Sequence, residues 1–125
     1  MRNFILALLL GFTSIDVFAT ECLSDFVWNG NWKDETTSLS VTNEIPFYSE
    51  YIGGEIIIYN RNPDRLIYYK VVDKFDNILR SGIVSKENSD QIQISISDLS
   101  NNNTYAIILT SQNSCDCVSM NFIKL

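Results

Sequence analysis

Three cysteines, Cys22, Cys115 and Cys117, carry the most reactive side chains of this sequence. Zinc takes most of its four structural ligands from cysteine and histidine, and the sequence contains no histidine. Redox motifs of the thioredoxin kind are spaced C-x-x-C at the start of a helix, whereas Cys115-Asp116-Cys117 leads into a strand-like run. We interpret the cysteines as structural, with redox chemistry and metal binding as the alternatives, and we predict no metal ligands.

An odd number of cysteines permits at most one internal disulfide and leaves one thiol over. The best pairing joins Cys22 to Cys115 or Cys117, because the first and last strands of a sandwich can lie close together. In the loop-entropy model such a bridge, which closes nearly the whole chain, stabilises the fold by roughly 4 to 5 kcal/mol.

Four carboxylates, Asp34, Glu35, Asp73 and Asp76, are further candidates for catalysis. Paired carboxylates hydrolyse glycosides, but such pairs sit in a cleft built by a larger scaffold. Asp73 and Asp76 flank a predicted hairpin turn, where short acidic side chains bond to the backbone. We therefore predict no catalytic residues and no cofactor.

Two tryptophans, Trp28 and Trp32, flank Asn29-Gly30-Asn31. Exposed indole rings can stack on sugars, so this pair is a weak candidate site for contact with a glycan or a protein. The alternative is packing at one end of a small core, which is the usual place of tryptophan. The sugar-binding hypothesis requires that at least one ring is exposed.

The strongest structural pattern runs from Gln91 to Leu109. Ile92, Ile94 and Ile96 alternate with polar residues, which predicts a strand with one buried face. An asparagine-rich corner follows, and Tyr105 opens the next strand. A tyrosine at this place can send its hydroxyl back to the preceding turn, as in immunoglobulin-type folds.

Other short runs complete the predicted strands, at 36–42, at 45–51 around Pro46, and at 55–59, 66–73, 78–84, 91–97, 104–110 and 118–124. Pro46 and Gly82 favour edge positions or a bulge, and 55–59 is a central strand. About seven short strands without helical periodicity predict an all-β Greek-key sandwich of the immunoglobulin-like class. Ile107 stands where antibody-type domains have their second core cysteine, so we place the chain in the fibronectin-III-like branch.

The first residues have the pattern of a secretory signal peptide. Arg2 precedes an apolar run from Phe4 to Phe12, and Val17 and Ala19 suit a cleavage site. We expect residues 1–19 to be removed, which leaves one domain at 20–125 that is exported to the periplasm or the cell exterior. Glu21 precedes Cys22, so we expect no lipid anchor. We also expect no membrane insertion after cleavage.

The net charge of −6 argues against anionic partners. An acidic surface repels phosphate backbones and anionic lipid, so we predict no nucleic-acid partner. We expect a monomer.

Taken together, these features resemble the DUF3244 family of small exported proteins from Bacteroidetes-type bacteria. The matching elements are the signal peptide, the motif 30–34, Ile45-Pro46, the hairpin 71–77 and the corner 99–105. The resemblance implies an immunoglobulin-like sandwich and an exported location, and it carries no catalytic or binding residues. Asn101 to Asn103 replace a glycine that is usual in the family, and asparagine tolerates positive φ.

We therefore expect a non-catalytic exported module that acts by contact with a protein or a glycan at the cell envelope. The second half also resembles a type IX secretion sorting domain, in its residues 71–80, 92–105 and 121–124. In that alternative the C-terminal strand directs sorting, and deletion of 121–125 should leave the fold largely intact. A third hypothesis is addition of a partner strand to an edge near Pro46 or Gly82.

Overall fold

The computed structural model describes residues 22–23, 26–33, 44–112 and 116–125. The predicted signal peptide, the strand-like run 36–42 and Cys115 lie outside these residues. Within them, no helix combines the length and the apolar character needed to cross a membrane.

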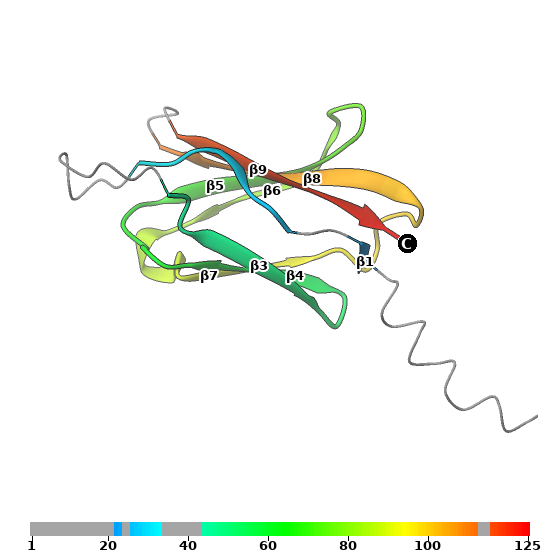
Figure 1. Ribbon diagram of the computed structural model, residues 1–125, viewed down its shortest axis with the longest axis horizontal. Helices are drawn as coiled ribbons and strands as arrows, with labels where there is room; N and C mark the ends of the chain where they lie inside the picture. Colours follow the sequence, from blue (N-terminus) through cyan, green and yellow to red (C-terminus); the bar gives the residue numbers. More distant parts are fainter. Residues whose placement is uncertain (1–21, 24–25, 34–43, 113–115) are drawn as a thin grey trace, which may run out of the picture.

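Two antiparallel sheets pack face to face (Figure 1). The six-stranded sheet has the order β1-β9-β8-β5-β6, and β2 also pairs with β9. Its strands are β1 (Cys22–Leu23), β2 (Asn29–Asn31), β5 (Ile67–Asp73), β6 (Ile78–Val84), β8 (Asn103–Ser111) and β9 (Cys117–Lys124). The three-stranded sheet has the order β3-β4-β7, with β3 (Phe47–Ile52), β4 (Glu55–Asn60) and β7 (Gln91–Ser95).

The chain changes sheet four times, between β2 and β3, between β4 and β5, between β6 and β7, and between β7 and β8. A short 3₁₀ helix, η2 (Lys86–Asn88), lies between β6 and β7. Hairpins join β3 to β4, β5 to β6 and β8 to β9. This connectivity confirms the predicted immunoglobulin-like Greek-key sandwich.

The core lies between the two sheets and follows the period of two. Ile92, Ile94 and Ile96 are all buried, as predicted. They belong to one core cluster whose members also include Ile56, Ile58, Ile67, Val71, Ile107, Leu109, Met120 and Phe122. Burial of one such side chain contributes about 1.5 to 3 kcal/mol, so the alternation itself drives the two sheets together.

The predicted tyrosine corner is present. The Tyr105 hydroxyl donates a hydrogen bond of 2.8 Å to the carbonyl of Ser100. Asn102 has a φ of 61°, so an asparagine takes the left-handed conformation that the corner needs. Ile107 is fully buried, which fits aliphatic packing in place of a core disulfide.

β3 and β6 are edge strands of their sheets, which confirms the edge positions predicted from Pro46 and Gly82. Two details of these strands differ from the prediction. The strand around Pro46 begins at Phe47, because proline has no N–H to donate to a ladder. The bulge predicted at Gly82 lies instead opposite Val71 and Val72, and Gly82 pairs regularly with Tyr69. Glycine is needed at position 82 because the Tyr69 ring packs against its backbone. A Cβ there would come within 2.6 Å of that ring.

Candidate functional site

The tryptophan pair is part of the core. Trp28 is 8% exposed and Trp32 is 2% exposed, and both rings contact Phe47. Trp28 also donates from Nε1 to the Ser49 hydroxyl at 2.9 Å. A sugar cannot reach the face of a buried ring, so the hypothesis that Trp28 and Trp32 form a sugar-stacking surface is wrong.

The cysteine prediction is corrected in part. Cys117 is exposed and is a free thiol. Cys22 pairs in register with Lys124, at the opposite end of β9 from Cys117. Seven strand residues span about 23 Å, whereas a disulfide needs Cα atoms within about 7 Å. The pair Cys22 and Cys117 is therefore excluded, and the pair with Cys115 falls outside the described residues.

The carboxylate pair of the hairpin serves the turn. Asp73 Oδ1 accepts hydrogen bonds of 2.9 Å from the backbone N–H groups of Phe75 and Asn77. Its Oδ2 accepts from the Asn77 side-chain amide at 3.0 Å. These bonds favour the charged form and lower the pKa of Asp73. Asp76 follows in the turn with a φ of 67°. Asp34 and Glu35 lie outside the described residues.

Metal ligands are not gathered in the part of the chain that the structure describes. No group of three or more cysteine, aspartate, glutamate or histidine side chains lies there in a metal-binding arrangement.

A buried ionic cluster closes one end of the sandwich, and the sequence analysis missed it. Arg65 donates to Asp116 at 2.5 Å and to Asp64 at 2.8 Å. Its guanidinium lies 4.9 Å from the centre of the Trp32 ring and also donates to the carbonyl of Lys33. Apart from the adjacent Asp64, the partners are distant in sequence, so no local pattern marks the cluster. Every contact is made within the protein, which indicates a structural role.

A buried lysine closes the other end. The Nζ of Lys124 donates to the carbonyls of Ile96, Ser97 and Leu99 at 2.8, 2.9 and 2.8 Å. Lys124 shares the inward face with Phe122, two residues before it, and both are buried. The expectation that deletion of 121–125 leaves the fold intact is therefore wrong, because it removes a core phenylalanine and this cap.

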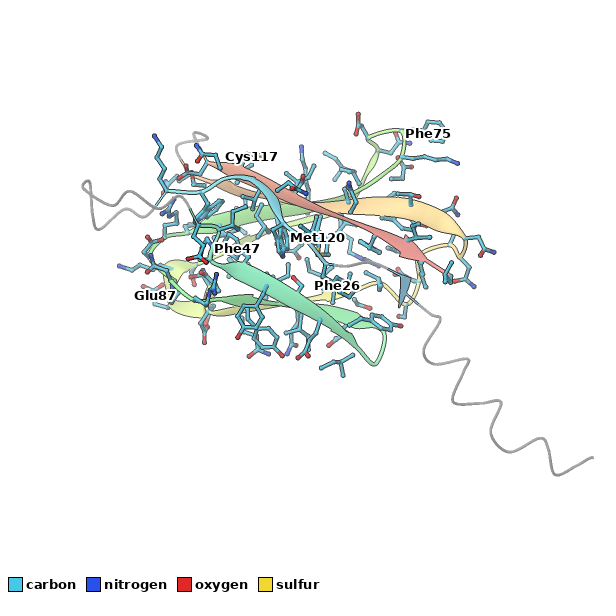
Figure 2. All side chains as sticks on the ribbon, viewed as in Figure 1. Phe26, Phe47, Phe75, Glu87, Cys117 and Met120 are labelled. Carbon is cyan, nitrogen blue, oxygen red and sulfur yellow. The ribbon has the colours of Figure 1, made fainter. Side chains whose placement is uncertain are left out.

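Exposed apolar side chains gather elsewhere, on the β5–β6 hairpin. Half of the large exposed hydrophobic residues in the described part of the chain lie on these two strands or their turn, namely Tyr68, Phe75, Ile78, Leu79 and Ile83. Phe75 is 72% exposed at the tip, which projects away from the sandwich (Figure 2). A concentration of this kind on a small acidic protein is a candidate contact surface.

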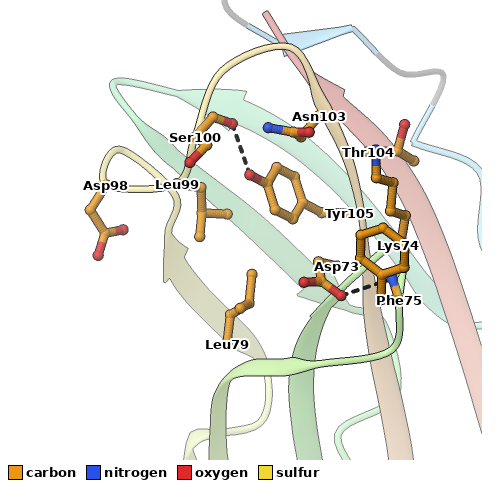
Figure 3. Close-up of a pocket in the computed structure, with 10 residues that line it drawn as sticks. All are labelled: Asp73, Lys74, Phe75, Leu79, Asp98, Leu99, Ser100, Asn103, Thr104 and Tyr105. Carbon is orange, nitrogen blue, oxygen red and sulfur yellow. Dashed lines mark hydrogen bonds between the residues drawn. The ribbon is translucent and has the colours of Figure 1, made fainter.

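A cleft of about 340 Å³ lies between this hairpin and the tyrosine corner (Figure 3). Phe75, Leu79, Leu99 and Tyr105 contribute its apolar lining, and Leu79 points toward Leu99. Polar residues complete the lining, namely Asp73, Lys74, Asp98, Ser100, Asn103 and Thr104.

The two carboxylates at the cleft, Asp73 and Asp98, are each bonded to neighbouring residues of the protein. Asp73 is held by its turn, and Asp98 forms an ion pair with Arg80 that lowers the pKa of Asp98. Arg80 also donates from Nε to the carbonyl of Ser95 at 3.0 Å, so it links β6 to β7 across the side of the sandwich.

The strand beside the cleft is the open edge of the larger sheet. The strand order ends at β6, and no described strand pairs with its outer side. Edge strands present free backbone N–H and C=O groups to which another strand can add. The edge near Gly82, one of the two that the sequence suggested, thus combines an open backbone with exposed apolar side chains.

Two tyrosines on the smaller sheet, the exposed Tyr48 and the partly buried Tyr59, contact their neighbours. Tyr48 stacks on Tyr59 with ring centres 5.0 Å apart, and the Arg61 guanidinium lies over the Tyr48 ring at 6.0 Å. The Tyr59 hydroxyl donates to Glu50, and this bond is the main cause of the raised pKa of Tyr59. These rings form a cross-strand ladder on the surface.

Comparison with known proteins gives one informative likeness. No family model and no curated protein matches the chain. The crystal structure of a DUF3244 family protein from Bacteroides vulgatus ATCC 8482, which has an immunoglobulin-like β-sandwich fold, superposes with a TM-score of 0.66. The superposition covers 82% of this chain and 98% of that chain, at 19% sequence identity. The chain has a DUF3244-like fold.

The resemblance inferred from the sequence is thereby confirmed for the fold. A DUF3244-like sandwich is a scaffold on which function depends on the surface that an individual chain presents. In this chain that surface is the β5–β6 hairpin with its open edge and cleft, rather than the tryptophans or the cysteines.

Proposed function

We propose that this DUF3244-like chain is an exported, non-catalytic module that acts by protein contact at the cell envelope, through the edge of β6. The observation that carries the proposal is the exposed edge itself, where Ile78 and Ile83 are 58% and 65% exposed. Strand addition to such an edge uses main-chain hydrogen bonds for affinity and neighbouring pockets for specificity. The cleft beside Leu79 supplies a pocket of that kind.

Export is proposed from the sequence alone. The pattern of residues 1–19 supports removal of a signal peptide, and the acidic mature chain suits a protein that stays away from anionic lipid. The periplasm and the cell exterior both fit this proposal.

A protein partner fits better than a glycan. Sugar binding uses accessible aromatic faces, and in this chain the indole rings are buried and the surface tyrosines Tyr48 and Tyr59 stack on each other. The exposed aliphatic residues of β6 and the free strand edge match the chemistry of an extended polypeptide.

Sorting through the C-terminal strand gains no support from the fold. β9 lies between β8 on one side and β1 and β2 on the other, and its side chains Phe122 and Lys124 are buried. If a receptor recognised β9 as a free strand, β9 would first have to separate from its neighbours in the sheet.

Photo-crosslinking in the producing cells tests the proposal. A photoreactive amino acid replaces Ile83 on β6 or, as a matched control, Ile52, which is 51% exposed on β3. We expect heavier adducts from position 83 and none above background from position 52. Monomer alone at both positions would contradict the proposal, and equal adducts at both would show that the edge of β6 is not selective.

A further inference from the structure

We propose that the β6 edge accepts a partner strand that carries an acidic side chain next to Ser81 and an apolar side chain next to Ile83. This inference rests on the proposed function, since it names the chemistry of the segment that the same edge binds. It follows from the outer face of the larger sheet, which points away from the core.

Two rows of outward side chains cross this sheet and end at β6. Each row joins facing residues of β8, β5 and β6: Ile108, Lys70 and Ser81 form one row, and Thr110, Tyr68 and Ile83 form the other. All six residues line a recess of about 410 Å³. A strand added to β6 would extend each row by one side chain, at two positions separated by a single residue.

Lys70 supplies the charge of this recess. β6, β8 and β9 contain no acidic residue, and the one of β5, Asp73, is bonded to its own turn. Lys70 forms no ion pair and no side-chain hydrogen bond with any residue that the structure describes. On a chain with a net charge of −6, an unpaired cation on a face without carboxylates favours an acidic segment over a basic one.

Ser81 separates Lys70 from the open edge. Neighbouring strands lie about 4.8 Å apart, so a partner residue next to Ser81 begins about 10 Å from the Cα of Lys70. Serine is short, so the lysine side chain can extend across it and meet a glutamate or aspartate of the partner. In the other row, Tyr68 and Ile83 are 36% and 65% exposed, and a partner residue next to Ile83 gains most by being apolar.

The smaller sheet offers no such match. Its strands β3, β4 and β7 contain no lysine or arginine, and they carry two glutamates, Glu50 and Glu55. β7 is an uncharged edge strand, but its exposed residues are the polar Gln91, Gln93 and Ser95. The Ser95 carbonyl also accepts a hydrogen bond from Arg80. Charge and apolar contact together therefore favour β6 over β7 for an acidic segment.

Selection from a phage-displayed library of short random peptides, with the purified protein as the target, tests the inference. We expect the selected peptides to carry an acidic and an apolar residue two positions apart. Lys70→Glu should replace the acidic residue by a basic one, because it reverses the charge of the recess. Lys86→Glu, the same reversal in the exposed helix η2, is the matched control and should leave the selected pattern unchanged. Circular dichroism checks that the variants are folded.

Fluorescence anisotropy with one selected peptide measures the size of the effect. We expect Lys70→Gln to weaken binding about threefold to fivefold, which corresponds to one surface ion pair. Replacement of the acidic peptide residue by its amide should cause the same loss, and the two changes together should cost no more than either alone. Ile83→Lys should weaken binding about tenfold or more, because it removes the apolar contact.

The outcomes separate this inference from the proposed function. Selected peptides without an acidic preference, or an acidic preference that Lys70→Glu leaves unchanged, overturn the inference. If Ile83→Lys still weakens the binding of such peptides, the edge of β6 remains the contact surface without this selectivity. Selection of no peptide at all also overturns the inference, and crosslinking at position 83 then decides the proposed function by itself.

Discussion

The hydroxyl of Tyr105 and the carbonyl of Ser100 are joined by a hydrogen bond of 2.8 Å that closes the corner between β7 and β8. Removal of the hydroxyl leaves a partly buried carbonyl without this donor. We expect Tyr105→Phe to lower the free energy of unfolding by about 1 kcal/mol. Urea denaturation measures the change. Tyr68→Phe, on the exposed face of β5, is the control and should have almost no effect.

The buried and exposed aromatic residues should respond differently to truncation. Trp28→Ala and Trp32→Ala each leave a cavity in the core, and we expect losses of roughly 3 to 5 kcal/mol in the free energy of unfolding. Phe75→Ala removes a ring that is 72% exposed and should change stability by less than about 0.5 kcal/mol. Thermal unfolding of the three variants measures this contrast. Similar losses at all three positions would contradict the burial described above.

The ion pair of Arg65 and Asp116 should be strongly coupled. Each single variant, Arg65→Met or Asp116→Asn, removes one member of a buried pair, and we expect a loss of roughly 3 to 5 kcal/mol. The double variant should lose less than the sum of the two, because the second substitution no longer leaves an unpaired group. A double-mutant cycle in urea measures the coupling. Arg61→Met, at an exposed guanidinium, is the control, and strict additivity at the buried pair would refute the coupling.

Lys124 should be needed for stability although it lies next to the C-terminal residue. Lys124→Met keeps the aliphatic stem and removes three hydrogen bonds to backbone carbonyls. We expect the free energy of unfolding to fall by about 2 to 4 kcal/mol. Lys86→Met in the exposed helix η2 is the matched control. Equal stability of the two variants would show that the buried ammonium contributes nothing.

Acid should weaken the turn of the β5–β6 hairpin. Asp73 has a lowered pKa in the folded state, chiefly because Asn77 donates hydrogen bonds to its carboxylate. Its contribution to stability is therefore present above the ordinary carboxyl pKa of about 3.9 and is lost as the pH falls through the lower folded value. A carboxyl titration followed by NMR measures the shift.

Asn77→Ala removes the main cause of this shift, so the pKa of Asp73 should rise toward its ordinary value. Asn88→Ala, in η2, removes an amide that bonds to Ser85 and should leave Asp73 unaffected. A titration of Asp73 that is the same in both variants would mean that Asn77 is not the cause.

Local patterns were sufficient for most of the fold. The alternation at Ile92 and Ile94 predicted the buried face of β7, because side chains of a strand point to opposite faces in turn, and Ile96 just after the strand is buried as well. The position of Tyr105 after the asparagine-rich corner predicted a hydrogen bond that the structure contains. Strand ends were less accurate, since Pro46 and the bulge at Val71 and Val72 depend on how neighbouring strands pair.

The candidate site was less predictable. The sequence offered Trp28 and Trp32 for contact, but aromatic residues serve cores and binding surfaces equally well, and only packing against Phe47 shows which applies. From the sequence, the hydrophobic residues of β6 predicted only a strand near an edge and not a contact surface. That Ile83 stays exposed became visible only when β6 was found at the end of the sheet.

The sequence by itself determined the class of fold, since periodicity of two, turn residues and the corner tyrosine act over a few neighbouring residues. Only the tertiary structure decided which groups meet across long separations. Arg65 and Asp116 are 51 residues apart, and Lys124 reaches carbonyls 25 to 28 residues earlier. Such contacts, like the open edge of β6, depend on the order of strands in the sheets, which is a property of the whole chain and not of any segment in it.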